Sequence, residues 1–408
     1  MPLPDRIAAF VQWIVPPNDE RVPITAANMG PRLFAPWLPV VLGAYLARRR
    51  DSLLLRMALA SVAPIIILRF SFGAIFMDEE YAWMTWLVGI LGAYCLVRTM
   101  ELCFASRGRL RVGEKELPPS TNLRDAFDLL CSARGYNWDF GTGSGMVVPP
   151  YNKPLEREPY LRATLFRVIW TYFAFDLLVA LVKLAPCAQT PAGGSIFMQD
   201  FPPAQRYILS TALTLATGLA VVFAFTCLYE LFAFLDVAYL HHPPTNWPPL
   251  FDDPWLSDSL SQFWGRRWHQ LLRSTFVELG GYPLSCVLAP LGKDWKRVGL
   301  VMGSFLASGF LHDLGMWGLD REVHWHAVML FIVQGFAVIG EGVFRKVTGK
   351  RVGGWSGRVW AYFMILVVGQ PMIDSWHQRG ILGGKIWPKE ASFARSVLFP
   401  LIRKYLFK

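Results

Sequence analysis

Two histidines lie in settings where an imidazole could do chemistry. His312 falls within the apolar run 298–319, and Ser308 precedes it by four residues, so both share one face of a helix. An ionisable side chain deep in such a run is costly and suggests function, as a general base or a proton relay. Small neighbours, among them Gly303 and Gly309, would let helices approach or leave room for a ligand. The alternative is a structural histidine bonded to a facing carbonyl group.

The second histidine, His269, lies among three arginines in the segment 257–276. These are Arg266, Arg267 and Arg273. Apolar residues recur there at spacings of three and four, namely Leu260, Phe263, Trp264, Trp268, Leu271 and Leu272. This period predicts one amphipathic helix at the membrane interface, with Ser257 or Asp258 as its cap. A simpler interpretation is a surface anchor whose arginines contact lipid phosphates.

Two irregular segments flank this predicted helix. Residues 241–256 contain five prolines in sixteen residues, which excludes a helix and predicts a stiff strap rich in turns. Residues 276–291 are apolar but short for a crossing, and Pro283 and Pro290 interrupt them. Because the next loop, 293–297, is basic, we expect a re-entrant hairpin that enters and leaves on the cytosolic side and forms a cavity wall.

The composition places these segments in a membrane. Of the 408 residues 53% are hydrophobic and 17% are charged, whereas a soluble domain has about 25% charged residues. Segments of about 20 apolar residues can cross a bilayer. We place crossings near residues 33–47, 53–76, 82–105, 160–186, 207–235, 298–319, 323–344 and 357–373. The sequence thus predicts an all-α, polytopic membrane protein with about eight transmembrane helices.

The distribution of Lys and Arg orients the predicted crossings. Basic clusters follow the first, third and seventh, as at Arg48, Arg109 and Arg345, while the alternate loops are acidic or poor in Lys and Arg. By the positive-inside rule the basic loops, including the long loop 106–159, face the cytosol. The formal net charge of +10 is therefore a topology signal, and we expect no nucleic acid as a partner.

The cysteines and histidines do not form a recognisable metal site. The six cysteines include no C-x-x-C pair. A di-iron membrane desaturase would need repeated H-x-x-x-H and H-x-x-H-H boxes, and the seven histidines form none. We therefore predict that no metal is bound.

Several short motifs resemble those of a known family. The segments 248–251 (Pro-Pro-Leu-Phe), 259–260 (Ser-Leu) and 263–269 (Phe-Trp-Gly-Arg-Arg-Trp-His) are similar to the signature of the wax synthase-like branch of the membrane-bound O-acyltransferase superfamily. The Ser-Gly-x-x-His sequence at 308–312 resembles the buried-histidine motif of that superfamily. The interval between these two motifs is also similar to the interval in that superfamily.

This resemblance implies an internal tunnel, cytosolic entry of acyl-CoA, and transfer of the acyl group to a hydroxyl held near the buried histidine. His312 is then the expected general base, and His269 orients the acyl group or stabilises the oxyanion, although the two roles stay interchangeable. Residues that bind CoA or substrate are expected at Arg266, Arg267, Arg273, Trp264, Trp268 and Ser308. Acyl-CoA is a cosubstrate in this scheme, and we expect no tightly bound cofactor.

Three hypotheses for the function remain open. Many relatives carry Asn where this chain has His269, and fungal members that acylate terpenoid and meroterpenoid alcohols resemble it more closely. The first hypothesis is therefore acetyl transfer to a lipophilic alcohol of that kind. The second is a long-chain wax or sterol ester synthase. The third is a transporter with His312 as proton relay, because Asp176, Glu230 and Glu341 also lie in predicted crossings.

These expectations define one membrane-embedded acyltransferase domain over residues 1–408, with a catalytic region at 241–312. That region comprises the strap, the amphipathic helix, the re-entrant segment and the helix of the buried histidine. The expected partners are acyl-CoA, a lipophilic alcohol and membrane lipid. The resemblance implies the endoplasmic reticulum as the location, with the CoA site facing the cytosol. Acceptor regiochemistry, acyl length and oligomeric state are not encoded in any motif.

Overall fold

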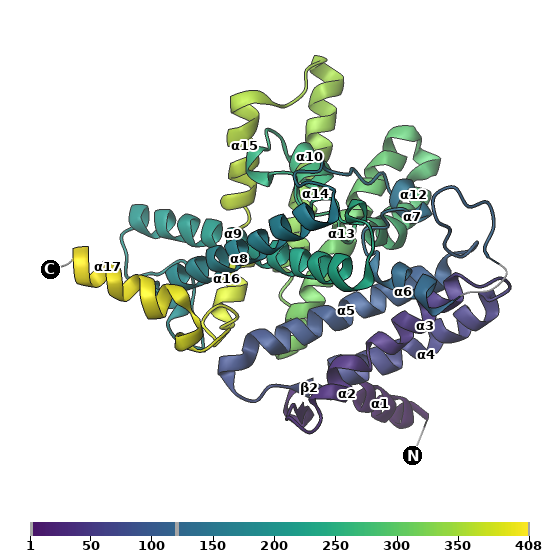
Figure 1. Ribbon diagram of the computed structural model, residues 1–408, viewed down its shortest axis with the longest axis horizontal. Helices are drawn as coiled ribbons and strands as arrows, with labels where there is room; N and C mark the ends of the chain where they lie inside the picture. The colour runs from purple at the N-terminus through teal and green to yellow at the C-terminus, as the bar shows by residue number, and fades with distance from the viewer. Residues whose placement is uncertain (1–2, 119–121, 407–408) are drawn as a thin grey trace. The chain divides into compact units, whose positions relative to one another are not determined.

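The computed structural model describes residues 3–118 and 122–406, which are built almost entirely from helices (Figure 1). Within these residues the only sheet pairs β1 (Val22–Pro23) in parallel with β2 (Ala74–Ile75). The expected all-α fold is confirmed. The chain divides into two compact units, and each has its own internal packing.

The first unit contains residues up to 78, then 84–146 and 271–340. Its helices are α1 (Leu3–Ile14), α2 (Met29–Phe34), α3 (Trp37–Ala47), α4 (Leu53–Ser71), most of α5 (Ala82–Phe104), α6 (Leu123–Cys131), α7 (Asp139–Gly143), α11 (Arg273–Phe276), α12 (Tyr282–Leu288), α13 (Lys293–Asp320) and most of α14 (His326–Thr348). Its core joins aliphatic residues of α3, α4 and α5 to Leu129, Trp138 and Phe140. Part of the predicted loop 106–159 is therefore packed structure.

The second unit contains residues 79–83, 147–270 and 341 onward. Its helices are α8 (Arg157–Val182), α9 (Pro203–Leu235), α10 (Leu260–Gln262), α15 (Gly354–Leu366), α16 (Gln370–Gln378) and α17 (Phe399–Leu406). The long helices α8 and α9 pack against each other, and α15 and α16 pack on α9. The signature segment 259–269 lies in this unit.

Six helices of the described chain are long and apolar enough to cross a membrane. They are Leu53–Ser71, Glu79–Phe104, Arg157–Val182, Pro203–Leu240, Lys293–Asp320 and His326–Thr348. They match six of the eight predicted crossings. The first and the eighth were wrong as single crossings, because α3 has 11 residues and α15 has 13, and each falls short of the roughly 20 residues that span a bilayer.

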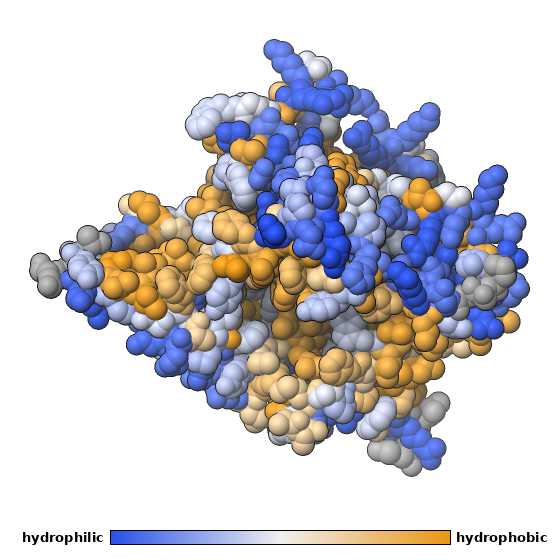
Figure 2. Space-filling view, viewed as in Figure 1, coloured by the Kyte–Doolittle hydropathy of each residue, from blue (hydrophilic) through white to orange (hydrophobic). Residues whose placement is uncertain are grey.

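The candidate spans expose apolar side chains, as expected for surfaces in contact with lipid. Figure 2 shows broad orange areas of apolar residues on one face of the molecule. Leu54 on α4 is 84% exposed and Phe166 on α8 is 72% exposed. An aqueous surface would not tolerate so much apolar area, which supports the assignment as an integral membrane protein.

The amphipathic helix predicted over 257–276 was wrong. The structure begins α10 at Leu260, with the side chain of Ser259 accepting a hydrogen bond from the backbone N–H of Gln262. A π-helical turn follows over Phe263–Arg267, and Trp268 then adopts extended backbone dihedrals. The helical backbone therefore ends before His269, and the cap is Ser259 in place of either expected residue.

The segment predicted to re-enter the membrane is helical throughout. After α11 a π-helical turn covers Val277–Gly281, α12 follows, and a short 3₁₀ turn ends at Leu291. Pro283 stands in the first turn of α12, where a proline needs no hydrogen bond from its nitrogen, so it does not break the helix. The expected interruption is replaced by a change of helical pitch at Gly280 and Gly281. Entry and exit on one side of the membrane stay a prediction.

Candidate active site

His312 lies on α13, and the preceding turn of the helix holds one of its ring nitrogens. Nδ1 lies 2.7 Å from the carbonyl oxygen of Ser308. Because a carbonyl group only accepts, Nδ1 carries the proton of this hydrogen bond, and Nε2 of the neutral ring keeps its lone pair. The ring is partly buried and packs on Phe331, with 5.1 Å between centroids. The geometry therefore defines Nε2 as the basic nitrogen.

Small residues bring other backbones close to α13. A methyl group added at Gly303 would lie 2.1 Å from the carbonyl oxygen of Gly280, and one added at Gly309 would lie 2.7 Å from Cα of Val328. These glycines thus allow close approach of neighbouring backbones, which is the first of the two roles that the sequence suggested for them. Ser308 is buried and contacts His312 through its backbone, so a substrate-binding role for its hydroxyl stays a prediction.

Asp313, next to the histidine in sequence, binds the start of another helix. Its carboxylate oxygens accept hydrogen bonds from the backbone N–H groups of Ala327 and Val328, at 3.2 and 3.3 Å. These are free donors of the first turn of α14, where a negative charge also favours the helix dipole. Asp313 thus fixes the junction of α13 and α14.

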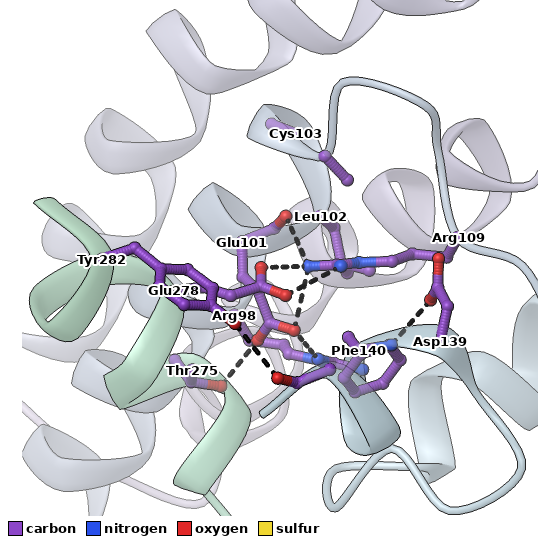
Figure 3. Close-up of polar contacts among 12 residues, drawn as sticks. Arg98, Glu101, Leu102, Cys103, Arg109, Asp139, Phe140, Thr275, Glu278 and Tyr282 are labelled. Atoms are coloured by element: carbon purple, nitrogen blue, oxygen red, sulfur yellow. Dashed lines mark hydrogen bonds and ion pairs between the residues drawn. The ribbon is translucent and has the colours of Figure 1, made fainter. Parts of the chain in front are cut away.

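A buried charge cluster ties the segment after Leu272 to α5 (Figure 3). Glu101 accepts hydrogen bonds from Arg98 at 2.6 Å and from the hydroxyl of Thr275 at 2.6 Å. Arg109 bridges Glu101, at 3.2 Å, and Glu278, at 2.9 Å. Sequence reasoning missed this cluster, because Arg109 counted only as a topology signal. It orders the start of the helical segment that packs against α13.

Arg273, one of the predicted CoA ligands, faces the loop after α7. Its Nε donates to the carbonyl oxygen of Ser144 at 3.0 Å. Burial lowers the pKa of its guanidinium below the ordinary value, although Arg stays charged at neutral pH. The side chain is therefore a partly buried cation in the first unit, which also contains His312 and Ser308.

His269 lies in the second unit among aromatic rings. Its ring centroid is 5.3 Å from that of Phe225, 5.7 Å from Phe251 and 5.3 Å from Trp268. Phe251 belongs to the Pro-Pro-Leu-Phe motif, so two predicted motif segments meet at this histidine. Apolar walls of this kind reduce the local dielectric constant and strengthen any hydrogen bond that the imidazole makes to a substrate.

Trp264 and Trp268 belong to one aromatic cluster with Phe263. Trp268 stacks on Phe263 with 5.2 Å between centroids and 26° between planes. Trp264 meets Phe263 edge-on at 4.9 Å and Trp268 at 6.0 Å. The apolar period that predicted a long helix thus packs as a compact turn. Contact of either tryptophan with substrate stays a prediction.

Arg266 and Arg267 are bound to the proline-rich strap. Nε of Arg266 lies 2.6 Å from the carboxylate of Asp252, while half of its side chain remains exposed. Arg267 donates to the backbone carbonyl of Asp252 at 2.7 Å and accepts from the backbone N–H of that residue at 3.0 Å. The two arginines therefore differ. Arg267 holds the strap in place, whereas the guanidinium of Arg266 still has N–H groups that can bind a ligand.

The strap is also held at its beginning. Asp236 accepts hydrogen bonds from Nε1 of Trp247 at 2.7 Å, and Nδ1 of His242 lies 2.8 Å from the same carboxylate. The hydroxyl of Tyr229 donates to the carbonyl oxygen of Pro248 at 2.7 Å. The predicted irregular strap is confirmed for residues 241–256, where only short 3₁₀ turns interrupt the extended chain.

Glu341 positions the signature segment from a distant part of the sequence. Its two carboxylate oxygens accept from the backbone N–H groups of Leu260 and Ser261, at 2.8 and 2.9 Å. Nε1 of Trp360 donates to the same group at 3.0 Å. A carboxylate at these free N–H groups anchors the turn that carries the arginines. No local pattern in the sequence signals this contact.

The other two carboxylates in predicted crossings also have partners. Asp176 accepts from Nε1 of Trp387 at 3.0 Å and from the backbone N–H of Ala394 at 2.8 Å. Glu230 forms an ion pair with Lys153, and Arg167 lies 3.7 Å away. Their charges are thus bound within the second unit, as buried charges in proteins normally are.

One group of residues in the described chain could offer three ligands to a metal ion: Asp320, Glu322 and His324. Nε2 of His324 lies 2.9 Å from the carboxylate of Asp320 and 3.8 Å from that of Glu322. Ordinary ion pairing accounts for this arrangement. We assign it no role in the chemistry below, and the absence of a bound metal stays a prediction.

Residues 247–334 match the model of the membrane bound O-acyl transferase family, and this region contains every predicted site residue. A long-chain-alcohol O-fatty-acyltransferase of Simmondsia chinensis is 34% identical over 25% of the chain, and an acyl-CoA–sterol O-acyltransferase of Arabidopsis thaliana is 31% identical over 25%. Acetyltransferase eriL of Hericium erinaceus is 22% identical over 60%.

The matched region spans 30% of the length of the two plant relatives and 64% of the fungal one. Fold and site together define a polytopic, helical membrane protein with a partly buried histidine in a candidate span. Residues 247–334 are similar to the membrane bound O-acyl transferase family, and the matched plant relatives are named as O-acyltransferases of long-chain alcohols and a sterol.

Proposed function

We propose that this chain transfers an acyl group from acyl-CoA to the hydroxyl of a lipophilic alcohol, with His312 as general base. The observation that carries this proposal is the hydrogen bond from Nδ1 of His312 to the carbonyl oxygen of Ser308. It selects the tautomer in which Nε2 can accept a proton. The similarity of residues 247–334 to the membrane bound O-acyl transferase family supports the reaction class.

In the proposed reaction the alcohol oxygen attacks the thioester carbonyl carbon while Nε2 of His312 accepts the hydroxyl proton. The carbon–sulfur bond then breaks, and the CoA thiolate leaves and receives that proton. An ester and free CoA are formed, and no oxidant, reductant or metal takes part. A base at hydrogen-bond distance typically contributes about 10²–10⁴-fold to such a step.

Arg266 is the best candidate for contact with the phosphates of CoA. It is half exposed, and its Nε is bound to Asp252, so its remaining N–H groups can pair with a phosphate. Arg267 donates from Nη1 to the strap and from Nε to Gln262, which makes it a support for Arg266. Arg273 is a partly buried cation of the first unit whose Nε is bound to Ser144, and we retain it as a candidate of lower accessibility.

His269 is proposed to orient the acyl group or to donate a hydrogen bond to the developing oxyanion. Its aromatic surroundings favour such a contact, because exclusion of water strengthens it. Ser308, Trp264 and Trp268 are retained as candidates for substrate contact. Their packing within their own units supports a well-ordered site.

The proposed acceptor is a terpenoid or meroterpenoid alcohol, and the proposed acyl group is acetyl. The match to the acetyltransferase of Hericium erinaceus extends over 60% of the chain and supports the choice of acetyl, while the acceptor class rests on the resemblance of the sequence motifs. The matches to enzymes named for long-chain alcohols and a sterol support the second candidate, a wax or sterol ester synthase. Both candidates release CoA, and they differ in the acyl length of the ester.

The transporter hypothesis is weaker than either. A proton pathway needs carboxylates that can exchange protons, whereas those of Asp176, Glu230 and Glu341 are engaged by backbone N–H groups, tryptophans or cations. A transporter would also produce flux across sealed vesicles without release of CoA.

The deciding experiment uses the full chain, purified and reconstituted into nanodiscs. Labelled acetyl-CoA or a labelled long-chain acyl-CoA is supplied with a terpenoid alcohol, a sterol or a fatty alcohol, and both CoA release and the ester are measured. We expect acetyl ester formation on the terpenoid alcohol, and its loss in His312→Ala. A long-chain ester would select the second candidate, and no CoA release with any pair would overturn the proposal.

The proposed location is the endoplasmic reticulum, with the CoA site on the cytosolic side. Single cysteines introduced near Arg109, His269 and Arg351 should react with an impermeant thiol reagent only from the cytosol. Labelling of the 269 region from the lumen would contradict both the CoA entry and the predicted hairpin over 276–291.

A further inference from the structure

A basic cleft in the first unit is lined by none of the residues assigned to the proposed reaction. It has a volume of about 420 Å³ and opens between the turn that joins α3 to α4 and the chain that follows α5. Its lining includes four arginines and two carboxylates: Arg49, Arg50, Arg56, Arg107, Asp51 and Glu116. The lining is therefore net positive by two formal charges.

The arginines of this cleft fall into two classes. Arg50 donates to Glu116 at 3.0 Å, and the buried Arg56 donates to Ser52 at 3.2 Å and to backbone carbonyls at the end of α5. Both charges are thus engaged within the protein. Arg49 contacts only the hydroxyl of Tyr45, at 3.3 Å, and within the described chain neither Arg49 nor Arg107 pairs with a carboxylate. Both are exposed and can bind an anion.

The polar groups around Ser52 add to this preference for anions. The hydroxyl of Ser52 donates to carbonyl oxygens of Leu46 and Arg49, and it makes no cap for α4. The first backbone N–H groups of α4 therefore have no side-chain cap. They can donate hydrogen bonds at the edge of the cleft, where the helix dipole is positive. Arg56 donates to carbonyl oxygens at the C-terminal end of α5, where the helix dipole is negative.

The surface beside the cleft is apolar. Leu53, which lines the cleft, is 47% exposed, and Leu54 and Leu55 next to it are 84% and 58% exposed. These leucines open α4, a candidate span, so acyl chains of the bilayer would cover them. A ligand at this place meets arginines with one end and leucines with the other, which is the chemistry of an anionic phospholipid.

We propose that this cleft binds the phosphate headgroup of an anionic phospholipid, with Arg49 and Arg107 as its ligands and the lipid chains along the first turns of α4. Arginine forks pair bidentately with phosphate oxygens. These two arginines have no carboxylate partner within the described chain, and their two positive charges match the one or two negative charges of a lipid phosphate. Basic pockets at the cytoplasmic ends of spans are suited to such lipids, and both loops of the cleft belong to the predicted cytosolic side.

The test compares two double variants that lose the same charge. The full chain is reconstituted into phosphatidylcholine nanodiscs with and without phosphatidic acid, and the midpoint of thermal unfolding is measured. Phosphatidic acid should raise the midpoint of the parent and of the control K296Q/R297Q, which removes two exposed charges elsewhere in the unit. The shift should vanish in R49Q/R107Q, and native mass spectrometry should show loss of the retained phosphatidic acid.

A third variant, R49K/R107K, keeps the charge and guards against a folding defect. It should retain part of the shift, because lysine binds phosphate without the bidentate geometry. An equal shift in R49Q/R107Q and the parent would overturn the proposal. It would also be overturned if CoA, added to pure phosphatidylcholine nanodiscs, gave a shift that requires Arg49 and Arg107 while phosphatidic acid gave none.

Discussion

His312 on α13 and His377 on α16 are both histidines on helices of a membrane protein, but their surroundings differ. His377 is 0% exposed, and both of its ring nitrogens have side-chain partners: Thr217 at 3.1 Å from Nε2 and Cys187 at 3.9 Å from Nδ1. His312 uses one nitrogen on a backbone carbonyl, and within the described chain Nε2 has no protein partner. A histidine whose two ring nitrogens both have protein partners is a structural histidine. A histidine with one ring nitrogen that has no protein partner can accept a proton and is a candidate base.

The comparison also explains why sequence position is a poor guide to reactivity. Both histidines follow apolar runs or lie in them, and neither belongs to a charged motif. Burial lowers the pKa of His377 to about 4, so this imidazole is neutral at physiological pH and acts as a fixed hydrogen-bonding group. A base that works at neutral pH needs an accessible lone pair, which only the three-dimensional contacts reveal.

The largest expected effect is on turnover. Replacing His312 by Ala should lower kcat and kcat/KM together by about 10²–10⁴-fold, because the imidazole gains its proton only as the hydroxyl attacks. The unfolding midpoint should change little. The measurement is kcat per folded molecule in nanodiscs, with the folded fraction determined by size-exclusion chromatography.

A companion variant decides which histidine is the base. His269→Asn introduces the residue that the resemblance implies for many members of the family, so it should keep part of the activity or change the acyl preference. If His269 were the base, this variant would be inactive and His312→Ala would only be slow. Parent rates in both variants would contradict the proposed mechanism altogether.

The second largest effect concerns folding. His377→Ala should lower the free energy of unfolding by about 2–3 kcal/mol, because it leaves a cavity and removes the partner of Thr217. Its kcat per folded molecule should stay near that of the parent. His377→Gln, which keeps a polar group at this position, should recover part of the stability. A loss of turnover in well-folded His377→Ala would contradict the purely structural role that distinguishes His377 from His312.

The third effect is the pH dependence that His377 confers on stability. Its pKa in the folded protein is about 4 and its ordinary value is 6.5, so between these values the unfolded chain binds more protons. Stability should therefore fall as pH decreases through this window, by at most about 1.4 kcal/mol per pH unit. Unfolding midpoints measured across the window should show a steeper decline in the parent than in His377→Gln. Equal slopes would contradict the assignment.

The helices that cross the membrane were predictable, because a run of about 20 apolar residues has few other solutions. The place of His312 within such a helix was predictable for the same reason, and its role as the base stays a prediction. Two of the eight crossings failed because apolar composition at 33–47 and 357–373 does not reveal where a helix begins or ends. α2 ends at Phe34 and α3 begins only at Trp37, while α15 stops at Leu366.

The signature segment was harder to predict, because contacts from elsewhere in the sequence decide its shape. The apolar spacing at Phe263, Trp264 and Trp268 fits a helix, but the rings pack on one another across a π-helical turn. The strap fixes Arg267, and Glu341 caps the turn from 80 residues away. Such long-range partners leave no periodic trace. Asymmetry between Arg266 and Arg267 likewise appears only in their contacts.

The smallest expected effect separates Asp313 from the chemistry of its neighbour. Its carboxylate binds the N–H groups of Ala327 and Val328, so Asp313→Ala should lower the free energy of unfolding by about 1 kcal/mol, as the loss of a helix cap does. Asp313→Asn keeps one acceptor oxygen and should lose less. Because Asp313 binds the start of α14, the loss should appear in stability, and kcat per folded molecule should stay near that of the parent in both variants. A loss of turnover with unchanged stability would make Asp313 a positioning residue of His312, whereas reduced stability with unchanged turnover leaves His312 to act through the Ser308 carbonyl contact alone.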